Sequence, residues 1–244
     1  MDNHEIVPSQ YWLFNDGISS RDFREIFDPS VGYIKRKIIT NLEYSEKDSL
    51  DLLIYFSGEG TTYNGEKVLL PYDANSNNSM TFFPLKDLYE DLSRIQNMSE
   101  VGNITLFMDV DFNNPAFEQN IVKKSDMVDD KKKKKKKKKK QPKEPIVTLP
   151  KELMPPAPIT VFFASDINQL AYEHPDHESS MFTYFLLKGL KGEADNGDKI
   201  VTVSELHNYV MKNVEDTTKT LYKDLPQIPL LYTSNPDRVL YKLP

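Results

Sequence analysis

Short runs of successive apolar residues mark the predicted strands of this chain. Residues 52–56 (LLIYF) and 104–108 (ITLFM) are apolar at almost every position, which is typical of a strand covered on both faces, as in a parallel sheet. A third run of this kind covers residues 159–164. Shorter strands are predicted at residues 10–14 and 230–233.

Amphipathic stretches lie between these strands. Apolar residues recur at helical spacing in the segments that we assign to helices, at residues 20–27, 31–42, 85–95, 180–190 and 203–214. Ser19 or Ser20 is suited to cap the first helix, because a serine oxygen accepts hydrogen bonds from the free amides of a first turn. Thr202, with Glu205 three residues later, forms a capping-box pattern before the last helix. The alternation predicts an α/β fold of three layers, in which a mainly parallel sheet carries helices on both faces.

A polar insert separates the two apolar-rich parts of the chain. Residues 117–158 contain six prolines and ten successive lysines, the first Lys131 and the last Lys140. Such a segment buries too little apolar surface to offset its chain entropy, so we predict that it is disordered. We therefore predict a single domain of two halves, residues 1–116 and 159–244, joined by this insert.

The charge of the chain is unevenly distributed. The formal net charge is −6, and without the ten successive lysines the rest of the chain carries −16. The lysine run predicts weak binding of polyanions, and the alternative is a solvated linker that repels itself. The sequence does not identify a protein partner.

The composition limits the chemistry and the location. The chain has no cysteine, which excludes disulfides and thiolate metal sites, and we expect no cofactor. Its start lacks a basic segment followed by an apolar one, and no apolar run approaches the roughly 20 residues that span a bilayer. We therefore expect no signal peptide, no membrane span and a cytoplasmic location.

Acidic residues follow each of the three long predicted strands: Glu59 the first, Asp109 and Asp111 the second, and Asp166 the third. Glu59 stands in the sequence SGEG, where we expect a tight glycine turn. Functional groups gather at the carboxyl ends of parallel strands, so these acids are expected to cluster. The first three could form a carboxylate dyad or hold a hard cation such as Ca²⁺ or Mg²⁺, and the alternative is a set of solvated acids in an open cleft.

Several segments resemble, in the same order, motifs of the caspase and metacaspase-like peptidase family. They are YFSGEGT at 55–61, YNGEKVLLPYDA at 63–74, LFMDVD at 106–111, FASDINQLAYE at 163–173 and FTYFLLKGLKG at 182–192. The first resembles the family's histidine loop, the third its strand ending in D-x-C, and the fourth its substrate-pocket strand. The insert falls where the family has the linker between its large and small subunits. The resemblance implies the three-layer caspase-like fold over most of the chain.

The catalytic positions of that family are altered here. Glu59 stands at the histidine position and Asp111 at the cysteine position, so we predict a pseudo-peptidase without catalytic residues, which acts as a protein-binding, scaffolding or regulatory module. One alternative is a hydrolase or metal-dependent activity that uses Glu59, Asp109 and Asp111. Another alternative is the capture of basic peptides without cleavage. It follows from the resemblance to metacaspases, in which acids at the positions of Asp109 and Asp166 help line a pocket for a basic side chain.

Overall fold

The computed structural model describes residues 17–112, 153–155, 158–166, 169–223 and 225–243. The helices are α1 (Ser20–Phe27), α2 (Tyr33–Glu43), α3 (Leu85–Gln96), α5 (Met181–Lys188) and α6 (Val203–Tyr222), with short turns η1 (Ser79–Thr81) and η3 (Gly189–Glu193). The strands are β1 (Leu50–Tyr63), β2 (Glu66–Leu70), β3 (Phe83–Pro84), β4 (Val101–Asp111), β5 (Thr160–Phe163), β6 (Ile200–Thr202), β7 (Leu230–Tyr232) and β8 (Val239–Lys242).

Six of the strands form one sheet in the order β3-β2-β1-β4-β5-β7. The central strands β1, β4 and β5 are parallel to one another. At the two sides of the sheet, β2 pairs antiparallel with β1, β3 pairs antiparallel with β2, and β7 pairs antiparallel with β5. Strands β6 and β8 form a separate antiparallel pair. β4 comes before the predicted insert and β5 after it, so one sheet is built from both halves of the sequence.

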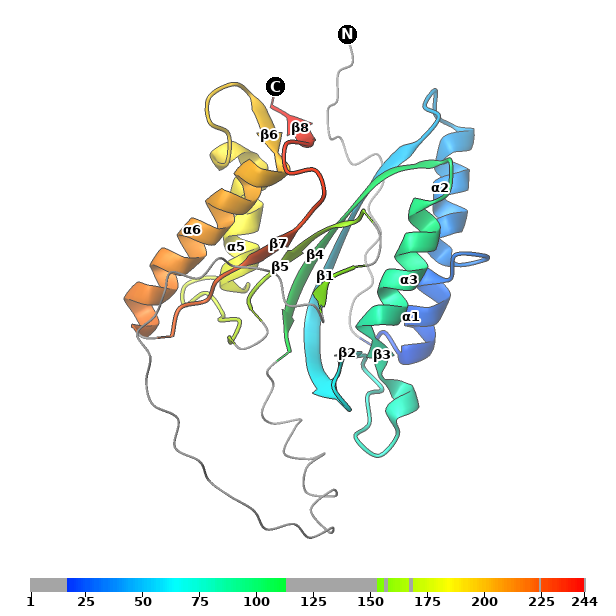
Figure 1. The fold of residues 1–244 in the computed structure, drawn as a ribbon, viewed down its shortest axis with the longest axis horizontal. Helices are drawn as coiled ribbons and strands as arrows, with labels where there is room; N and C mark the ends of the chain where they lie inside the picture. Colours follow the sequence, from blue (N-terminus) through cyan, green and yellow to red (C-terminus); the bar gives the residue numbers. More distant parts are fainter. Residues whose placement is uncertain (1–16, 113–152, 156–157, 167–168, 224, 244) are drawn as a thin grey trace.

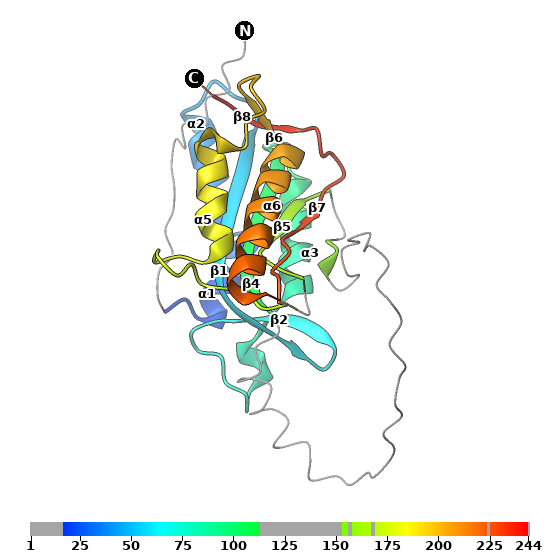
Figure 2. The same ribbon diagram turned by 90° about the vertical axis from the view of Figure 1, so that its left-hand side faces the viewer.

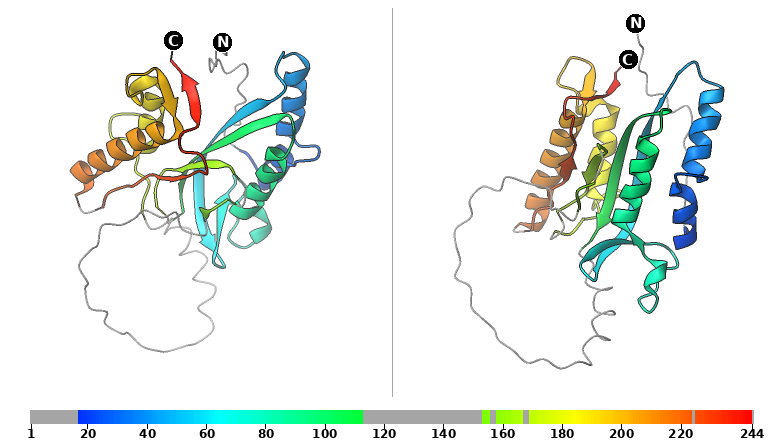
Figure 3. Two further views of the ribbon diagram at one scale, coloured as in Figure 1. Left: turned by 45° about the horizontal axis from the view of Figure 1, so that its top comes forward. Right: turned by 45° about the vertical axis from the view of Figure 1, so that its right-hand side comes forward.

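Helices cover both faces of the sheet, which confirms the predicted three-layer α/β architecture. Figure 1 shows α1, α2 and α3 on one side and α5 and α6 on the other. Each layer has its own apolar core: the first includes Phe83, Leu92 and Met108, and the second includes Phe107 and Phe162. The two views in Figure 3 show the sheet between these layers.

The two predicted helix caps are confirmed. Ser19 caps α1 and shares a capping box with Asp22. Thr202 caps α6, and its hydroxyl exchanges hydrogen bonds with Glu205, as the capping-box pattern predicts. The helix extends to Tyr222, eight residues beyond the predicted end.

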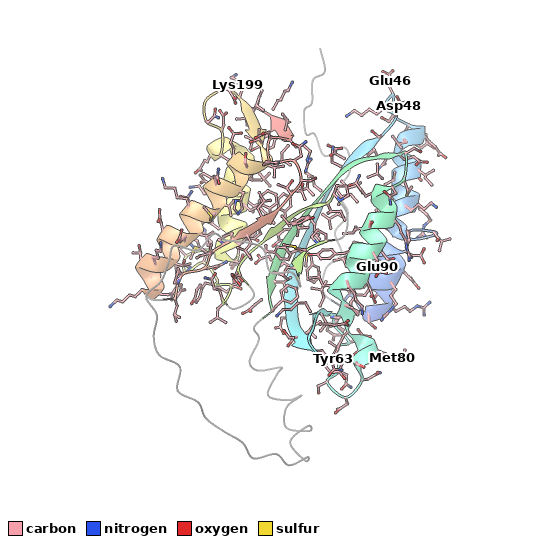
Figure 4. All side chains as sticks on the ribbon, in the orientation of Figure 1. Glu46, Asp48, Tyr63, Met80, Glu90 and Lys199 are labelled. Carbon is pink, nitrogen blue, oxygen red and sulfur yellow. The ribbon has the colours of Figure 1, made fainter. Side chains whose placement is uncertain are left out.

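The prediction of a glycine turn after residue 57 is wrong. β1 continues without a break to Tyr63, and the chain reverses at Asn64 and Gly65, whose φ values of 51° and 81° suit a two-residue hairpin turn. Gly60 is needed for a different reason, because a Cβ atom there would lie 2.6 Å from the ring of Phe112. Figure 4 shows the length of β1: Tyr63 at its end lies far from Glu46 and Asp48, in the loop before it.

The prediction that residues 52–56 are covered on both faces is wrong for one face. Leu53 and Tyr55 are 45% and 48% exposed, whereas β4 is buried from Ile104 to Val110. The second core is built on Phe107 and Phe162, from β4 and β5, so α5 and α6 cover those strands and leave Leu53 and Tyr55 of β1 about half exposed. Figure 2 shows these two helices in front of the sheet.

Several predictions lie outside the described residues. They are the short strand at residues 10–14, the disorder of residues 117–152, and the lysine run with its polyanion binding. The predicted disorder is wrong at Leu153, which is fully buried in the first core and whose carbonyl accepts a hydrogen bond of 3.0 Å from the hydroxyl of Tyr89. Within the described ranges, no helix combines the length and apolar composition needed to cross a bilayer.

Candidate functional site

Glu59 and Asp111 are neighbours at the carboxyl ends of two parallel strands. They are register partners in the pairing of β1 with β4. Asp111 lies four residues after Phe107, which belongs to the second core, so alternation along the strand places both acids on the face of the sheet that carries α5. Glu59 is exposed and Asp111 is half-buried. The predicted approach of these two acids is thus present in the structure.

Asp109, two residues before Asp111 on the same face, has a different environment. Its side chain is buried, with 6% exposure, and its Oδ2 atom accepts hydrogen bonds from the hydroxyls of Ser180 and Thr183, both at 2.5 Å. The hydroxyl of Tyr55 lies 3.3 Å from the same oxygen. Three hydroxyls from two other elements therefore converge on one carboxylate oxygen.

The protons of this cluster can be placed from its geometry. Thr183 gives its single hydroxyl proton to Asp109, which leaves the threonine oxygen free to accept from Tyr55, 2.7 Å away. The phenol proton of Tyr55 is therefore directed mainly at Thr183. Burial raises the pKa of Tyr55, and the nearby negative charge of Asp109 adds to this, so the phenol stays protonated.

The same cluster fixes the start of α5. Ser180 is the N-cap of this helix, and its oxygen accepts from the backbone N–H of Thr183 while its hydroxyl proton goes to Asp109. A carboxylate beside the first turn of a helix is also favoured by the helix dipole. Asp109 thus anchors α5 to β4. Its predicted role in binding a basic side chain stays a prediction.

Asp166 lies three residues beyond the end of β5 and is half-buried. Its backbone carbonyl accepts from the N–H of Gln169, and residues 167–168 between them are outside the described part of the chain. The structure therefore places Asp166 at the end of the strand next to β4. Its predicted contact with a basic ligand stays a prediction.

Gln227 holds the loop that follows β5. Its fully buried amide donates to the carbonyl of Ala164 at 2.8 Å and accepts from the N–H of Tyr172 at 2.9 Å. The N–H of Gln227 in turn donates to Thr218 on α6. One side chain therefore ties the end of the sheet, the loop and α6 together.

The placement of the acids bears on the predicted cation site. Across the residues that the structure describes, no three or more histidine or acidic side chains are placed to hold one, and Glu59, Asp109 and Asp111 are all among those residues. The hydroxyls of Ser180 and Thr183 surround Asp109 instead of further carboxylates. The predicted alternative of a cation site gains no support from this geometry.

Three members of the cluster were not anticipated from the sequence: Tyr55, Ser180 and Thr183. Ser180 and Thr183 are 71 and 74 positions after Asp109, and nothing in their local sequence points to that acid. The one available signal was Ser180 before the apolar helix. A serine at this position predicts a helix cap, but it does not predict the hydrogen bond to Asp109. Tyr55 was read as part of a buried strand.

A comparison with protein-family models finds one match, to the caspase domain (Peptidase_C14), over residues 23–241. The matched region includes Glu59, Asp109, Asp111 and Asp166. No curated protein matches the sequence.

Solved structures with weak similarity are found as well. A Geobacter sulfurreducens protein matches with 13% identity and a TM-score of 0.43, over 82% of this chain and 71% of its own. Caspase-1 from Spodoptera frugiperda matches with 13% identity and a TM-score of 0.43, over 95% and 82% of the two chains. A structure described as pro-sf-caspase-1 matches with 12% identity and a TM-score of 0.41, over 95% and 84%.

Proposed function

This chain belongs to the caspase domain family, and from that premise we propose that it is a catalytically inactive member that acts by binding other proteins. One observation carries the proposal. The positions that resemble the family's histidine and cysteine are Glu59 and Asp111, and the sequence contains no cysteine at all.

The chemistry of the two side chains supports inactivity. A thiolate attacks a peptide carbonyl near neutral pH because its pKa is accessible and sulfur is strongly nucleophilic. Asp111 offers a weak carboxylate nucleophile in its place. Glu59 could move a proton, but it has no thiol to activate, and its neighbour in the sheet register is a second acid.

Peptidase assays test the inactive state. The purified chain should not release fluorophore from peptide substrates with Asp, Arg or Lys at the cleaved position, and the Asp111→Ala variant should behave in the same way. Turnover by the unmodified chain that disappears in Asp111→Ala would overturn the proposal. It would favour the hydrolase that uses the acidic residues.

Restoring the two family residues tests how much of the site remains. The double variant Glu59→His with Asp111→Cys should show at most a trace of activity, because a displacement of about 1 Å in the supporting groups already cripples a site. The single variant Asp111→Cys, which lacks the imidazole, is the matched control. Activity in the double variant at the level of an ordinary family peptidase would show that the two side chains alone had been lost.

The proposed binding role is tested by titrating a purified partner protein into the full chain. Candidate proteins captured with the full chain should bind it saturably in calorimetry. Glu59→Gln with Asp111→Asn should bind with unchanged affinity, since the proposed role does not use the former catalytic positions. Failure of every purified candidate to bind would remove the scaffold part of the proposal and leave inactivity untouched.

A further inference from the structure

Arg238, between β7 and β8, is a half-buried cation that forms no ion pair among the residues that the structure describes. Its Nη2 atom donates to the hydroxyl of Thr105 at 2.5 Å, and within the described ranges this is the one hydrogen bond of its side chain. A guanidinium carries five N–H donors, so most of them are left without a protein acceptor in this part of the chain. The site therefore combines a positive charge with an excess of donors.

The contact with Thr105 places the guanidinium on the sheet. Thr105 is fully buried on β4, and its register partners are Leu53 on β1 and Thr160 on β5. The hydroxyl of Thr160 lies 3.0 Å from that of Thr233, so three threonines cross the sheet at the level of Leu53. Thr105 lies two residues before a member of the second core, so this row is on the face of the sheet that carries α5.

One acid lies within electrostatic range of Arg238. Burial lowers the pKa of Arg238, and the negative charge of Asp51 on β1 acts in the opposite direction. The carboxylate of Asp51 accepts instead from the backbone N–H and the side-chain amide of Asn103, at 2.8 and 3.0 Å. An arginine stays charged in a protein, so Asp51 leaves the charged N–H groups of Arg238 available to a second carboxylate.

Apolar side chains are exposed beside this cation. Leu53 and Tyr55 of β1 are 45% and 48% exposed, and Leu187 of α5 is 50% exposed. Leu187 lies one helical turn after Thr183, whose hydroxyl is 2.7 Å from that of Tyr55, so it projects from the same side of the helix. These three side chains, Leu53, Tyr55 and Leu187, form an apolar strip that begins at the level of Arg238.

We propose that Arg238 and the apolar strip bind a segment of a partner protein in which a glutamate or aspartate stands beside leucine-like side chains. The carboxylate accepts two N–H groups of Arg238 in the fork geometry that a guanidinium offers, and the apolar side chains cover Leu53 and Tyr55. This inference rests on the proposed protein-binding role, and it specifies the chemistry of the partner.

The local charges favour a carboxylate over a phosphate. Arg238 supplies a single positive charge and Asp51 stands nearby with a negative one, so a phosphate group close to doubly charged would be poorly compensated. A carboxylate carries one charge, and its two oxygens match the guanidinium fork. Outside the lysine run the chain carries a net charge of −16, so a general attraction would favour basic partners. Selection of an acidic partner therefore requires a local contact such as the one with Arg238.

A library of random peptides displayed on phage tests the partner chemistry. The library is first depleted on the full-length Arg238→Gln variant, which removes peptides captured by the lysine run, and is then selected on the unmodified full chain. The enriched peptides should carry an acidic residue beside apolar ones. Enrichment that occurs only without the depletion step would overturn the inference and leave the protein-binding role standing. No enrichment in either selection would count against both.

Titration of a selected peptide, followed by fluorescence anisotropy, locates the contact. Arg238→Gln should weaken binding by about tenfold or more, and Arg238→Lys should weaken it less, because lysine keeps the charge without the fork. Leu53→Gln should also weaken binding, whereas Asp51→Asn should strengthen it by removing a like charge. Arg21→Gln is the control and should have no effect, since Arg21 is an exposed residue of α1 that pairs with Glu25.

A matched peptide distinguishes binding from a structural role of Arg238. When the acidic residue of the peptide is replaced by glutamine, the unmodified chain should bind it about as weakly as Arg238→Gln does, and the substitution in the chain should then have little further effect. Thermal unfolding checks that the variant is folded. Equal losses for the acidic and the glutamine peptide on Arg238→Gln would mean that the arginine acts only within the sheet, and would overturn the inference.

Discussion

The hydroxyl of Thr183 on α5 donates a hydrogen bond of 2.5 Å to the carboxylate of Asp109 on β4. The two residues are 74 positions apart, so this bond joins a helix from the second half of the chain to a strand from the first. Ser180 and Tyr55 complete the same cluster, so the hydroxyls of three side chains surround one carboxylate oxygen of Asp109.

Asp109→Asn should lower the free energy of unfolding by about 1–3 kcal/mol, because the hydroxyls then donate to a neutral amide oxygen in place of a charged carboxylate, and hydrogen bonds to charged groups are the stronger ones. Asp111→Asn, on the same strand and face, is the matched control and should cost less, since its side chain is half-buried whereas that of Asp109 is buried. Urea denaturation measures both. Equal losses would show that the cluster does not stabilise the fold.

A double-mutant cycle between Asp109→Ala and Thr183→Val measures the coupling between these two side chains. The two changes should be less than additive, with a coupling of about 1–2 kcal/mol, as expected for contacting residues in one hydrogen-bonded network. The same cycle with Thr220→Val should be additive, because Thr220 bonds to a carbonyl of α6, away from this site. Additivity in both cycles would contradict the assigned contact.

Thr61→Val should stabilise the protein by up to about 1 kcal/mol, because a buried hydroxyl without a partner carries a desolvation cost that a methyl group does not. The side chain of Thr61 is fully buried, and its hydroxyl has no hydrogen-bond partner within the described part of the chain. Its neighbour Thr62 accepts from Lys67 at 2.6 Å. Thr62→Val is thus the control, with no gain expected, and thermal unfolding of both variants provides the comparison.

His207 should make stability depend on pH below neutrality. Burial lowers the pKa of His207 from its ordinary 6.5, and its Nε2 atom lies 3.2 Å from the carbonyl of Pro229, which can only accept, so the neutral ring carries its proton there. A folded-state pKa below the unfolded one means that the unfolded chain binds the proton first. Neutral His207 therefore makes its full contribution to the free energy of unfolding above about pH 6.5, the unfolded pKa. This contribution is lost as the pH falls below that value.

The variant His207→Gln isolates this dependence, because its amide can still donate to Pro229 and does not titrate. The difference in unfolding free energy between the unmodified chain and the variant should shrink or change sign from pH 7.5 to pH 5. Denaturation curves at several pH values across that range supply the measurement. A constant difference would mean that His207 keeps its ordinary pKa in the folded chain.

Brief treatment with trypsin should cut first in the lysine run at residues 131–140, which the sequence predicts to be disordered and which lies outside the described residues. The two fragments should stay together, because Thr105 to Met108 of β4 pair with Thr160 to Phe163 of β5. Gel electrophoresis locates the cut and a sizing column tests the association. Separation of the fragments under native conditions would contradict a sheet shared by both halves.

The sequence predicted the features that depend on neighbouring residues. Thr202 and Glu205 are three positions apart, and both the cap and the start of the helix are where the pattern places them. The parallel register that brings Glu59 beside Asp111 was also accessible, because consecutive buried strands separated by helices pack in this way.

The wrong predictions concern contacts between distant parts of the chain. Whether Leu53 is buried or exposed depends on where α5 lies. The apolar residues around Leu53 in the sequence are the same in both cases, so they could not distinguish them. Gly60 was read as a turn residue because glycine serves both in turns and at close approaches, and only the position of the Phe112 ring distinguishes the two. The hydroxyls around Asp109 belong to the same class of distant contact.

The parallel pairing of β4 with β5 also has a kinetic consequence. Thr105 is the register partner of Thr160, 55 positions later, so the chain must close a long loop before these strands can meet. Each doubling of loop length adds only about 0.6 kcal/mol to the entropic free-energy cost of closing the loop. This cost arises before the contact between the strands can stabilise the chain, so it slows folding. A connection of a quarter of that length should speed folding by up to about eightfold and leave the unfolding rate nearly unchanged, if the two strands are already paired in the transition state.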